Sequence, residues 1–225
     1  MEWQLPIRMA SDRIRESSPH TKSETANDCS SFANSTGDFS CQEFDSSMRV
    51  LITEEQIRQR VIELGARLSH EYQGRPLTIL GVLTGSVVLL ADLIRATNVP
   101  LRVALISASS YGGTRTSPGE LSVNSSLVPD LSGRHVVILD DIFDTGKTMV
   151  GLLDAVQQFG PASIKSAVLL WKTERTCVDL VPDFFGFQIP DEFVVGYGLD
   201  YNDEFRHLPY VGIPDPDDLH MANGG

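Results

Sequence analysis

The sequence lacks the features that mark several large classes of protein. Its 225 residues include 3 cysteines, an odd number, and their spacing matches no zinc-binding pattern. The longest apolar runs, residues 87–91 and 167–171, are far too short to cross a bilayer. The first residues do not show a basic stretch followed by an apolar one, which is the pattern of a secretion signal. We therefore expect a cytoplasmic protein with reduced thiols.

Positive charge is also scarce. Lysine and arginine together number 18, against 30 aspartate and glutamate residues, which gives a formal net charge of -12 and a pI of about 4.7. A net acidic surface argues against non-specific binding to nucleic acid, where lysine and arginine neutralise phosphates. We expect neither nucleic acid nor a membrane as a partner, although a local basic pocket is compatible with this charge.

The chain is long enough for one α/β domain with a substantial core, and 41% of its residues are apolar. Residues 11–47 differ from the rest, because they are rich in Ser, Thr, Asn and Asp and show no sustained period. Such a segment buries too little apolar area to offset its ordering entropy. We expect residues 1–47 to be a disordered or loosely attached extension, and residues 48–225 to form the folded domain.

Strand and helix patterns alternate along this domain. Thr53 and Gln56 are spaced as a capping box before apolar residues at helical spacing, and Gly74 and Pro76 end that helix. Further on, the patterns predict strands over residues 77–83, 101–107, 135–139 and 163–171, and helices over residues 87–97 and 147–159. This alternation is typical of a mostly parallel sheet covered by helices, in which ligands bind at the carboxyl ends of the strands.

The most informative segment covers residues 135–148. An apolar strand runs into Asp140 and Asp141, Asp144 follows, and a Thr-Gly-Lys-Thr turn then opens a helix. Three carboxylates this close would repel one another unless a cation or ligand lay among them. The N–H groups at the start of a helix are a ready site for a phosphate. The segment therefore indicates a phosphorylated sugar handled together with a divalent cation.

Three other interpretations of this segment compete. A P-loop needs a glycine five residues before Gly146, and position 141 is aspartate, so that interpretation fails. Asp-Thr-Gly is also the catalytic turn of aspartic proteases, but those proteins are rich in β-structure, whereas a helix follows here. The third interpretation is a solvated acidic loop that has no chemical role.

Residues 136–149 resemble the phosphoribosyl-pyrophosphate (PRPP) signature of phosphoribosyltransferases. The resemblance extends to residues 81–86, which look like the pyrophosphate loop of that family, and to Ser110 and Tyr111, which look like the pair in its flexible loop. Residues 194–202 and the Phe205-Arg206 pair are similar to the C-terminal part of hypoxanthine/guanine phosphoribosyltransferases. Together these matches cover about residues 52–213.

The resemblance implies a type I phosphoribosyltransferase fold: an α/β protein whose mostly parallel twisted sheet is flanked by helices, with a small hood and a long flexible loop. It implies an enzyme of purine salvage that transfers ribose 5-phosphate from PRPP to hypoxanthine or guanine, giving IMP or GMP and pyrophosphate. It also implies Mg²⁺ as cofactor, PRPP and a 6-oxopurine as partners, and assembly as a homodimer or homotetramer. The polar, glycine-rich residues 108–129 match the flexible loop, and we expect them to form a mobile lid.

The resemblance also assigns roles to residues at the sugar and phosphate end. Asp144 matches the general base at purine N7, although an aspartate there is also a good helix N-cap. Asp140 and Asp141 match the acids that accept hydrogen bonds from the ribose hydroxyls and sit beside Mg²⁺. The 5′-phosphate cradle corresponds to Thr145, Gly146, Lys147 and Thr148. The pyrophosphate contacts correspond to Thr84, Gly85 and Arg206.

At the base end, Lys172 matches the lysine that binds the exocyclic O6 of the purine, and Phe193 and Val194 match residues that pack on the base. Asp200 matches an acid that lies by the base and binds the metal. For Lys172 the plain alternative is an exposed strand end, and for Arg206 it is a surface ion pair with Asp203 or Glu204.

The sequence departs from the family pattern at three positions. Asp140 stands where the family usually has Glu, Thr84 where many relatives have Lys, and Ser109 where relatives often have Lys. The family often has a cis peptide between the positions of Leu83 and Thr84. Two alternatives stay open: an RNA-binding regulator of the pyrimidine-operon attenuator type on the same fold, and a PRPP-binding homologue of low activity. Asp144 favours the purine enzyme, because pyrimidine-type members lack the N7 base.

Overall fold

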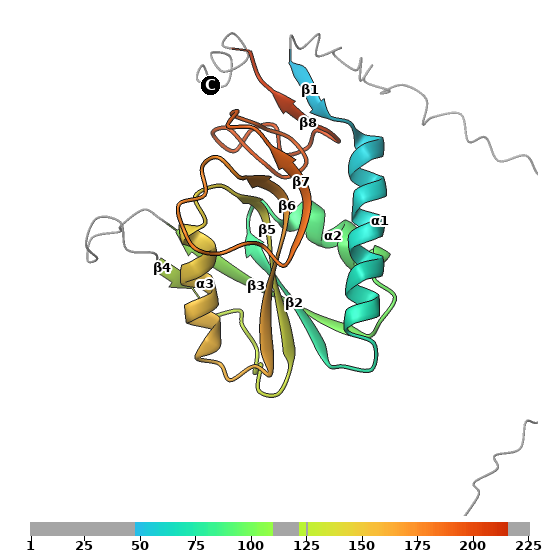
Figure 1. Ribbon diagram of the computed structural model, residues 1–225, viewed down its shortest axis with the longest axis vertical. Helices are drawn as coiled ribbons and strands as arrows, with labels where there is room; N and C mark the ends of the chain where they lie inside the picture. The colour runs from blue at the N-terminus through green and yellow to red at the C-terminus, as the bar shows by residue number, and fades with distance from the viewer. Residues whose placement is uncertain (1–47, 110–121, 125, 216–225) are drawn as a thin grey trace, which may run out of the picture. The chain divides into compact units, whose positions relative to one another are not determined.

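The computed structural model describes residues 48–109, 122–124 and 126–215. Within them a six-stranded sheet has the order β4-β3-β2-β5-β6-β7, and all neighbours are parallel except β4, which runs antiparallel to β3 (Figure 1). Its strands are β2 (Leu77–Leu83), β3 (Leu101–Ser109), β4 (Ser122–Asn124), β5 (His135–Phe143), β6 (Ser163–Lys172) and β7 (Phe184–Ile189). The predicted mostly parallel sheet flanked by helices is confirmed.

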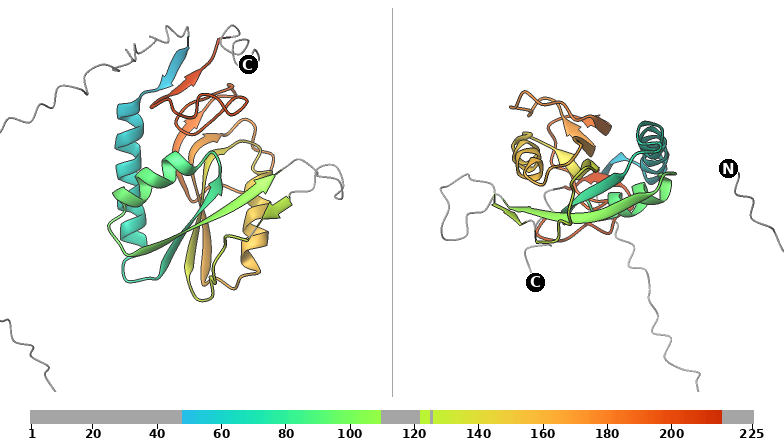
Figure 2. Two further views of the ribbon diagram at one scale, coloured as in Figure 1. Left: turned by 180° about the vertical axis from the view of Figure 1, so that it is seen from behind. Right: turned by 90° about the horizontal axis from the view of Figure 1, so that it is seen from below.

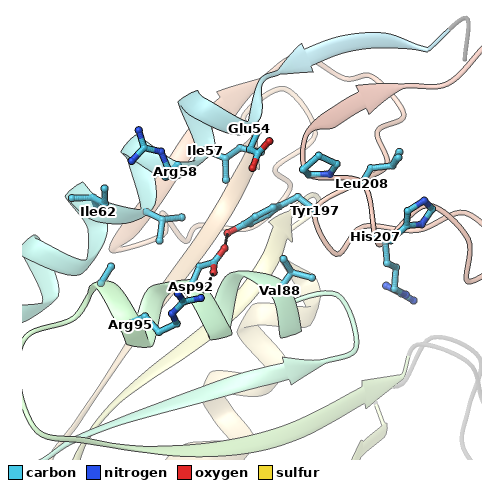
Figure 3. Close-up of a pocket in the computed structure, with 14 residues that line it drawn as sticks. Glu54, Ile57, Arg58, Ile62, Val88, Asp92, Arg95, Tyr197, His207 and Leu208 are labelled. Carbon is cyan, nitrogen blue, oxygen red and sulfur yellow. Dashed lines mark hydrogen bonds and ion pairs between the residues drawn. The ribbon is translucent and has the colours of Figure 1, made fainter. Parts of the chain in front are cut away.

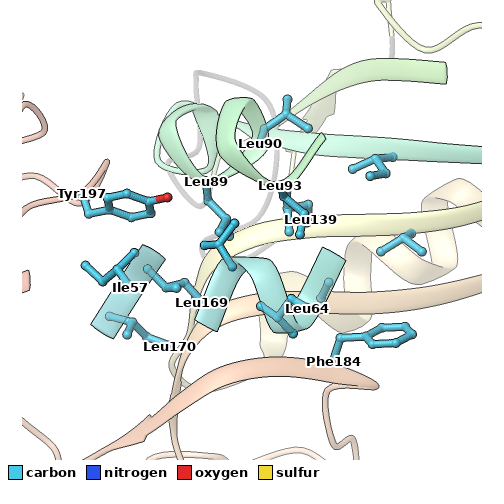
Figure 4. Close-up of a cluster of buried hydrophobic side chains, with 14 of the residues drawn as sticks. Ile57, Leu64, Leu89, Leu90, Leu93, Leu139, Leu169, Leu170, Phe184 and Tyr197 are labelled. Atoms are coloured by element: carbon cyan, nitrogen blue, oxygen red, sulfur yellow. The ribbon is translucent and has the colours of Figure 1, made fainter. Parts of the chain in front are cut away.

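Helices cover both faces of this sheet (Figure 2). They are α1 (Glu54–Glu71), α2 (Val87–Ala96) and α3 (Lys147–Gln157). One buried cluster joins α1 and α2 to alternate strand residues such as Ile79, Val137 and Leu169 (Figure 4). A second cluster joins α3 to the intervening residues, such as Ile138 and Val168. Because both faces are covered, the central strands are apolar throughout and not alternating.

The start of α1 is set by local chemistry. The Gln56 N–H donates to Thr53 Oγ1 at 3.3 Å, and the Thr53 N–H donates to Gln56 Oε1 at 2.9 Å, so the predicted capping box is confirmed. From there α1 packs closely on α2, since a Cβ added to Gly65 would lie 2.6 Å from the carbonyl oxygen of Ala96. None of the helices in the described part of the chain is long and apolar enough to cross a membrane.

The predicted ends of α2, α3, β3 and β6 differ from the structure by one or two residues, and that of β5 by four. Strand β5 continues to Phe143, four residues beyond the predicted end, so Asp140 and Asp141 lie inside the strand and not in a turn after it. The reason is the neighbouring strand, because the ladder with β6 continues through Asp140, Ile142 and Phe143. Strand β3 likewise runs two residues further than predicted, to Ser109.

Four short strands were not predicted: β4 and β7 in the main sheet, and the antiparallel pair β1 (Arg49–Ile52) and β8 (Val211–Ile213). The pair β1 and β8 forms a small second sheet. An antiparallel bridge between Gly212 of β8 and Val195 joins this sheet to the segment that begins at Val195. The expectations for residues 1–47, for Ser110 and Tyr111, and for residues 110–121 and 125 of the expected lid lie outside the described residues. The boundary at residue 48 and the hood stay predictions.

Candidate active site

Two adjacent carboxylates form the centre of the site, near the carboxyl end of β5. Asp140 and Asp141 are both half-buried, and their Oδ1 atoms accept hydrogen bonds from the backbone N–H groups of Asp141 and Ile142, at 3.0 and 2.7 Å. Burial raises the pKa of Asp140 well above its ordinary value, and the charge of Asp141 raises it further. Burial also raises the pKa of Asp141. The pair is therefore poised to take hydroxyl donors or a cation.

The turn between β2 and α2 packs directly on this pair. A Cβ added to Gly85 would overlap the carboxylate of Asp141, so the turn reaches the acid only because residue 85 has no side chain. The peptide bond between Leu83 and Thr84 is cis, as expected from the family resemblance. Thr84 is exposed, and the buried Ser86 donates from its hydroxyl to the carbonyl of Val82 at 2.6 Å.

A third segment, residues 196–206, closes on the same place. Gly198 has φ 99°, and a Cβ there would overlap the carbonyl oxygen of Gly85. Arg206 donates to the carbonyl of Gly198 at 2.7 Å, and its charge acts on Asp141 by lowering the pKa that burial raises. The ends of β2 and β5 and this C-terminal segment thus lie against one another at the carboxyl ends of the strands, where a parallel sheet binds its ligands.

Arg206 itself is largely held by acids. Its Nη2 lies 2.9 Å from Oδ1 of Asp200 and 3.2 Å from Oδ1 of Asp203, and its side chain is 24% exposed. The alternative of a surface pair with Asp203 or Glu204 describes only part of this arrangement, because the shorter contact is with Asp200. The predicted pyrophosphate contact and the predicted metal ligand are therefore paired with each other.

The turn that follows β5 leads into α3. Gly146 is the N-cap of α3 with φ 83°, and a Cβ there would lie 2.6 Å from Cζ of Phe143. The N-cap alternative for Asp144 is therefore wrong, since the N-cap lies two residues later, at Gly146. A cavity of about 340 Å³ lies against residues 140–146, 148 and 149. Thr145, Gly146 and Thr148 line it with Asp144, whereas Lys147 is exposed and is not among its lining residues.

At the end of β6, Lys172 is 7% exposed, so the exposed-lysine alternative is wrong. Its Nζ lies 3.6 Å from Oδ1 of Asp191. Val194 is buried, whereas Phe193 is 49% exposed and meets the ring of Tyr201 edge-on, with centroids 5.8 Å apart. A buried lysine held by one distant carboxylate retains donors for a ligand.

Sequence reasoning missed Arg175 and Asp191. Nε of Arg175 lies 2.8 Å from Oδ1 of Asp144, out of line for a hydrogen bond, and its Nη1 lies 3.4 Å from Oδ1 of Asp191. The available signal for Arg175 was its position in the sequence, three residues after Lys172, which was predicted to bind O6 of the purine. The position of Asp191, after β7, carries no local signal.

The oxygen donors fit Mg²⁺. Among the residues that the structure describes, no group of three or more His, Cys, Asp and Glu side chains is placed to hold a metal ion by itself. Mg²⁺ commonly takes one or two protein carboxylates and completes its shell with substrate oxygens and water. Asp140 and Asp141, two adjacent carboxylates with raised pKa values, match that need. Asp200 is paired with Arg206, whose charge also acts on Asp141.

A larger cavity, of about 660 Å³, lies between α1, α2 and residues 206–209, and neither Asp140 nor Asp141 lines it (Figure 3). The hydroxyl of Tyr197 donates there to Oδ2 of Asp92 at 2.7 Å, and burial raises the tyrosine pKa. Arg58 and Arg95 are each paired with an acid on their own helix, Glu55 and Asp92. The smaller cavity is the one lined by Asp140, Asp141, Asp144 and the start of α3.

Comparison with known proteins gives a consistent result. The model of the phosphoribosyl transferase domain matches residues 51–202. The hypoxanthine-guanine phosphoribosyltransferase of Bacillus subtilis is 41% identical over 168 residues, which cover 75% of this chain and 93% of that protein. The protein of the same name from Streptococcus pneumoniae is 38% identical and covers 73% and 92%. A crystal structure of a hypoxanthine phosphoribosyltransferase from Staphylococcus aureus has a TM-score of 0.72 and 38% identity, and the match covers 80% of this chain and 97% of that one.

Proposed function

The chain belongs to the phosphoribosyltransferase family, and on this premise we propose that it is a hypoxanthine/guanine phosphoribosyltransferase of purine salvage. The enzyme transfers ribose 5-phosphate from PRPP to hypoxanthine or guanine and releases pyrophosphate. The observation that carries the proposal is the contact of Gly85 with Asp141, closed over by Gly198 and Arg206, because it joins the three segments of the family pattern in one crevice. An RNA-binding regulator is not favoured, since the named relatives are enzymes over most of the chain.

The reaction needs a fixed sugar, a stabilised leaving group and removal of a proton from the base. N9 of the purine bonds to C1′ while the bond from C1′ to the pyrophosphate oxygen breaks, and that electron pair leaves with pyrophosphate. The proton on N7 passes to the carboxylate of Asp144, and the N–H electron pair stays in the imidazole ring. The transition state resembles an oxocarbenium ion, as in glycoside cleavage.

Asp140 and Asp141 orient the sugar. The raised pKa of each acid means that the ionised pair gains when hydroxyl donors approach, and the ribose 2′- and 3′-hydroxyls are such donors. Mg²⁺, where bound, would be held by Asp140 and Asp141 and would supply positive charge that offsets the negative charge of the leaving pyrophosphate. Asp200 is a further oxygen donor, if Arg206 turns from it to the pyrophosphate.

The phosphate groups bind at both ends of the crevice. The 5′-phosphate meets the N–H groups of residues 145–148, because the first N–H groups of α3 have no partner within the helix and carry its positive dipole. Pyrophosphate meets the backbone of Thr84 and Gly85 and the guanidinium of Arg206. Because Thr84 replaces a family lysine, we expect weaker pyrophosphate binding than in relatives that keep the lysine.

The base binds between Lys172 and the residues Phe193 and Val194. The ammonium of Lys172 donates to O6, which selects 6-oxopurines over adenine, because adenine presents a donor amine at that position. Its burial beside a single carboxylate supports this role. Phe193, half exposed, covers the base when it enters.

Steady-state turnover with PRPP, Mg²⁺ and each of hypoxanthine, guanine, xanthine, adenine and uracil tests the proposal. We expect turnover with hypoxanthine or guanine and none with uracil. Absence of turnover with every 6-oxopurine, at enzyme levels where a relative is active, would exclude the enzyme. The replacement Asp144→Asn should lower kcat at least about 100-fold with little change in PRPP binding. Asp154→Asn, on the exposed side of α3, is the matched control.

We further propose assembly as a homodimer or homotetramer and a cytoplasmic location, both from the family resemblance. Light scattering coupled to size-exclusion chromatography tests the first proposal, and a monomer at micromolar concentration would contradict it.

A further inference from the structure

Four charged side chains of alternating sign form a chain from Asp144, the proposed general base, to Lys172, the proposed donor to O6. Asp144 meets Arg175 (2.8 Å), Arg175 meets Asp191 (3.4 Å), and Asp191 meets Lys172 (3.6 Å). In a 6-oxopurine, N7 and O6 are neighbouring atoms on one edge of the base. The charged chain therefore begins and ends at the two side chains that the proposed function assigns to that edge.

The backbone holds Arg175 between the two ends. Its N–H donates to the carbonyl of Lys172 at 3.2 Å, so the guanidinium leaves the chain one turn beyond the end of β6. Two residues further on, the N–H of Cys177 donates to the carbonyl of Thr145 at 3.1 Å. The segment that carries Arg175 is thus fastened to the turn that carries Asp144, and the guanidinium stays near this acid.

The contacts along the chain compete with one another. Arg175 and Lys172 both approach the same oxygen of Asp191, and Arg175 divides its guanidinium between Asp191 and Asp144. The contact with Asp144 is the shortest but is not aligned as a hydrogen bond. The side chains of Arg175 and Asp144 are 44% and 39% exposed, so water screens part of their attraction, while Oδ1 of Asp144 itself is buried.

We propose that Arg175 is a positioning residue that occupies the general base until a 6-oxopurine draws Lys172 away from Asp191. This inference rests on the proposed function. When O6 accepts a hydrogen bond from Lys172, Asp191 loses its share of the ammonium charge and attracts the guanidinium more strongly. Arg175 moves toward Asp191, and the carboxylate of Asp144 is released to take the proton from N7.

In this mechanism the identity of the purine decides whether the general base, Asp144, is released. A purine with a donor group at position 6 cannot accept from Lys172, so Asp191 stays occupied and Arg175 stays on Asp144. Discrimination then appears in kcat and not only in KM, because the wrong base binds a site whose proton acceptor is masked.

The test is a double-mutant cycle on kcat with hypoxanthine at saturating PRPP and Mg²⁺. Asp191→Asn removes the second acceptor for Arg175, so the guanidinium stays on Asp144, and kcat should fall about tenfold. Adding Arg175→Gln removes the guanidinium, so kcat should recover to within about threefold of wild type. Asp191→Glu, which keeps the carboxylate, should recover most of the loss. Glu174→Gln, an exposed neighbour, is the matched control.

Recovery of kcat when Arg175→Gln is added to Asp191→Asn distinguishes this role of Arg175 from a structural role. If Arg175 and Asp191 only brace the loops, the double variant will be as slow as the slower single variant or slower, and the proposal is wrong. Wild-type protein without turnover would refute the proposed function itself, whereas an active wild type without suppression refutes only this inference.

A second measurement needs no variant. In a crystal structure with hypoxanthine and an unreactive PRPP analogue, we expect Nε of Arg175 to lie beyond 3.5 Å from Asp144, a distance outside hydrogen-bond range, and its guanidinium to contact Asp191. An Arg175 that keeps its 2.8 Å contact with Asp144 beside a bound purine would overturn the proposal.

Discussion

Replacing Gly85 by alanine should disable the site while leaving the fold intact. The added Cβ would lie 2.5 Å from Cγ of Asp141, whereas ordinary van der Waals contacts begin near 3.4 Å. The Oδ2 atom of Asp141 would lie closer still, so either the carboxylate or the turn must move by at least about 0.9 Å, and a misplacement of about 1 Å near reacting groups can cost roughly 100-fold in rate. That loss corresponds to about 2.7 kcal/mol of transition-state stabilisation.

Gly65→Ala supplies the matched control, since it creates a similar overlap far from the chemistry. Its Cβ would lie 2.6 Å from the carbonyl oxygen of Ala96, between α1 and α2. Overpacking there costs about 1–3 kcal/mol, partly offset by about 1 kcal/mol from the better helix propensity of alanine. Gly65→Ala should lower the thermal midpoint and keep kcat/KM for active, folded protein.

Thermal unfolding and steady-state kinetics with hypoxanthine and PRPP, measured on both variants, separate the two effects. We expect Gly85→Ala to lose about 100-fold in kcat/KM with a modest change in midpoint. A Gly85→Ala protein that keeps kcat/KM within about threefold of wild type would refute the reasoning, because the contact between the turn and Asp141 would then be dispensable.

Three further predictions follow from single contacts. Thr53→Ala removes the capping box of α1 and should cost about 1 kcal/mol in chemical denaturation, with unchanged kcat; an unchanged midpoint would contradict the cap geometry. Asp140→Asn should raise the thermal midpoint of the ligand-free protein at neutral pH, because the folded state raises the pKa of this acid and so disfavours its charged form. The gain in midpoint should vanish as the pH falls below the pKa of the acid in the unfolded chain, about 4. A variant less stable than wild type at pH 7 would contradict this prediction. Lys172→Met should lower kcat/KM for hypoxanthine by at least about tenfold and narrow the preference over adenine, and an unchanged ratio of the two substrates would remove the lysine from base selection.

Local chemistry made much of the fold predictable. The strand at Leu77–Leu83 was predicted with its bounds, because its residues are continuously apolar and turn signals flank it. The capping box at Thr53 and Gln56 fixed the start of α1 in the same way. Both features depend on residues within one turn or one strand, where propensity and side-chain hydrogen bonds decide the conformation.

Long-range partners decided what could not be predicted. Asp140 and Asp141 resemble loop residues by themselves, yet β6 continues the ladder beside them and keeps them in a strand. Strand β1 exists only because it pairs with β8, about 160 residues further along the chain. Strands this short carry little signal of their own, so the partner sets their conformation.

The site divides in the same way. The acids, the glycines and Lys172 stand in local patterns at or near the carboxyl ends of strands, and the family resemblance identified them. Arg175 and Asp191 lie in connecting segments whose positions depend on how residues 173–183 and 190–194 fold back over the sheet. The folding of these connections joins the two residues, which no spacing in the sequence expresses.

The central claim is that this protein joins ribose 5-phosphate to a 6-oxopurine. Incubation of the purified protein with PRPP, Mg²⁺ and hypoxanthine, followed by quantification of both products, tests it most directly. The account predicts IMP and pyrophosphate in equal amounts, with product formation abolished when hypoxanthine is omitted. Pyrophosphate or ribose 5-phosphate released without IMP, or no reaction with either hypoxanthine or guanine, would contradict it.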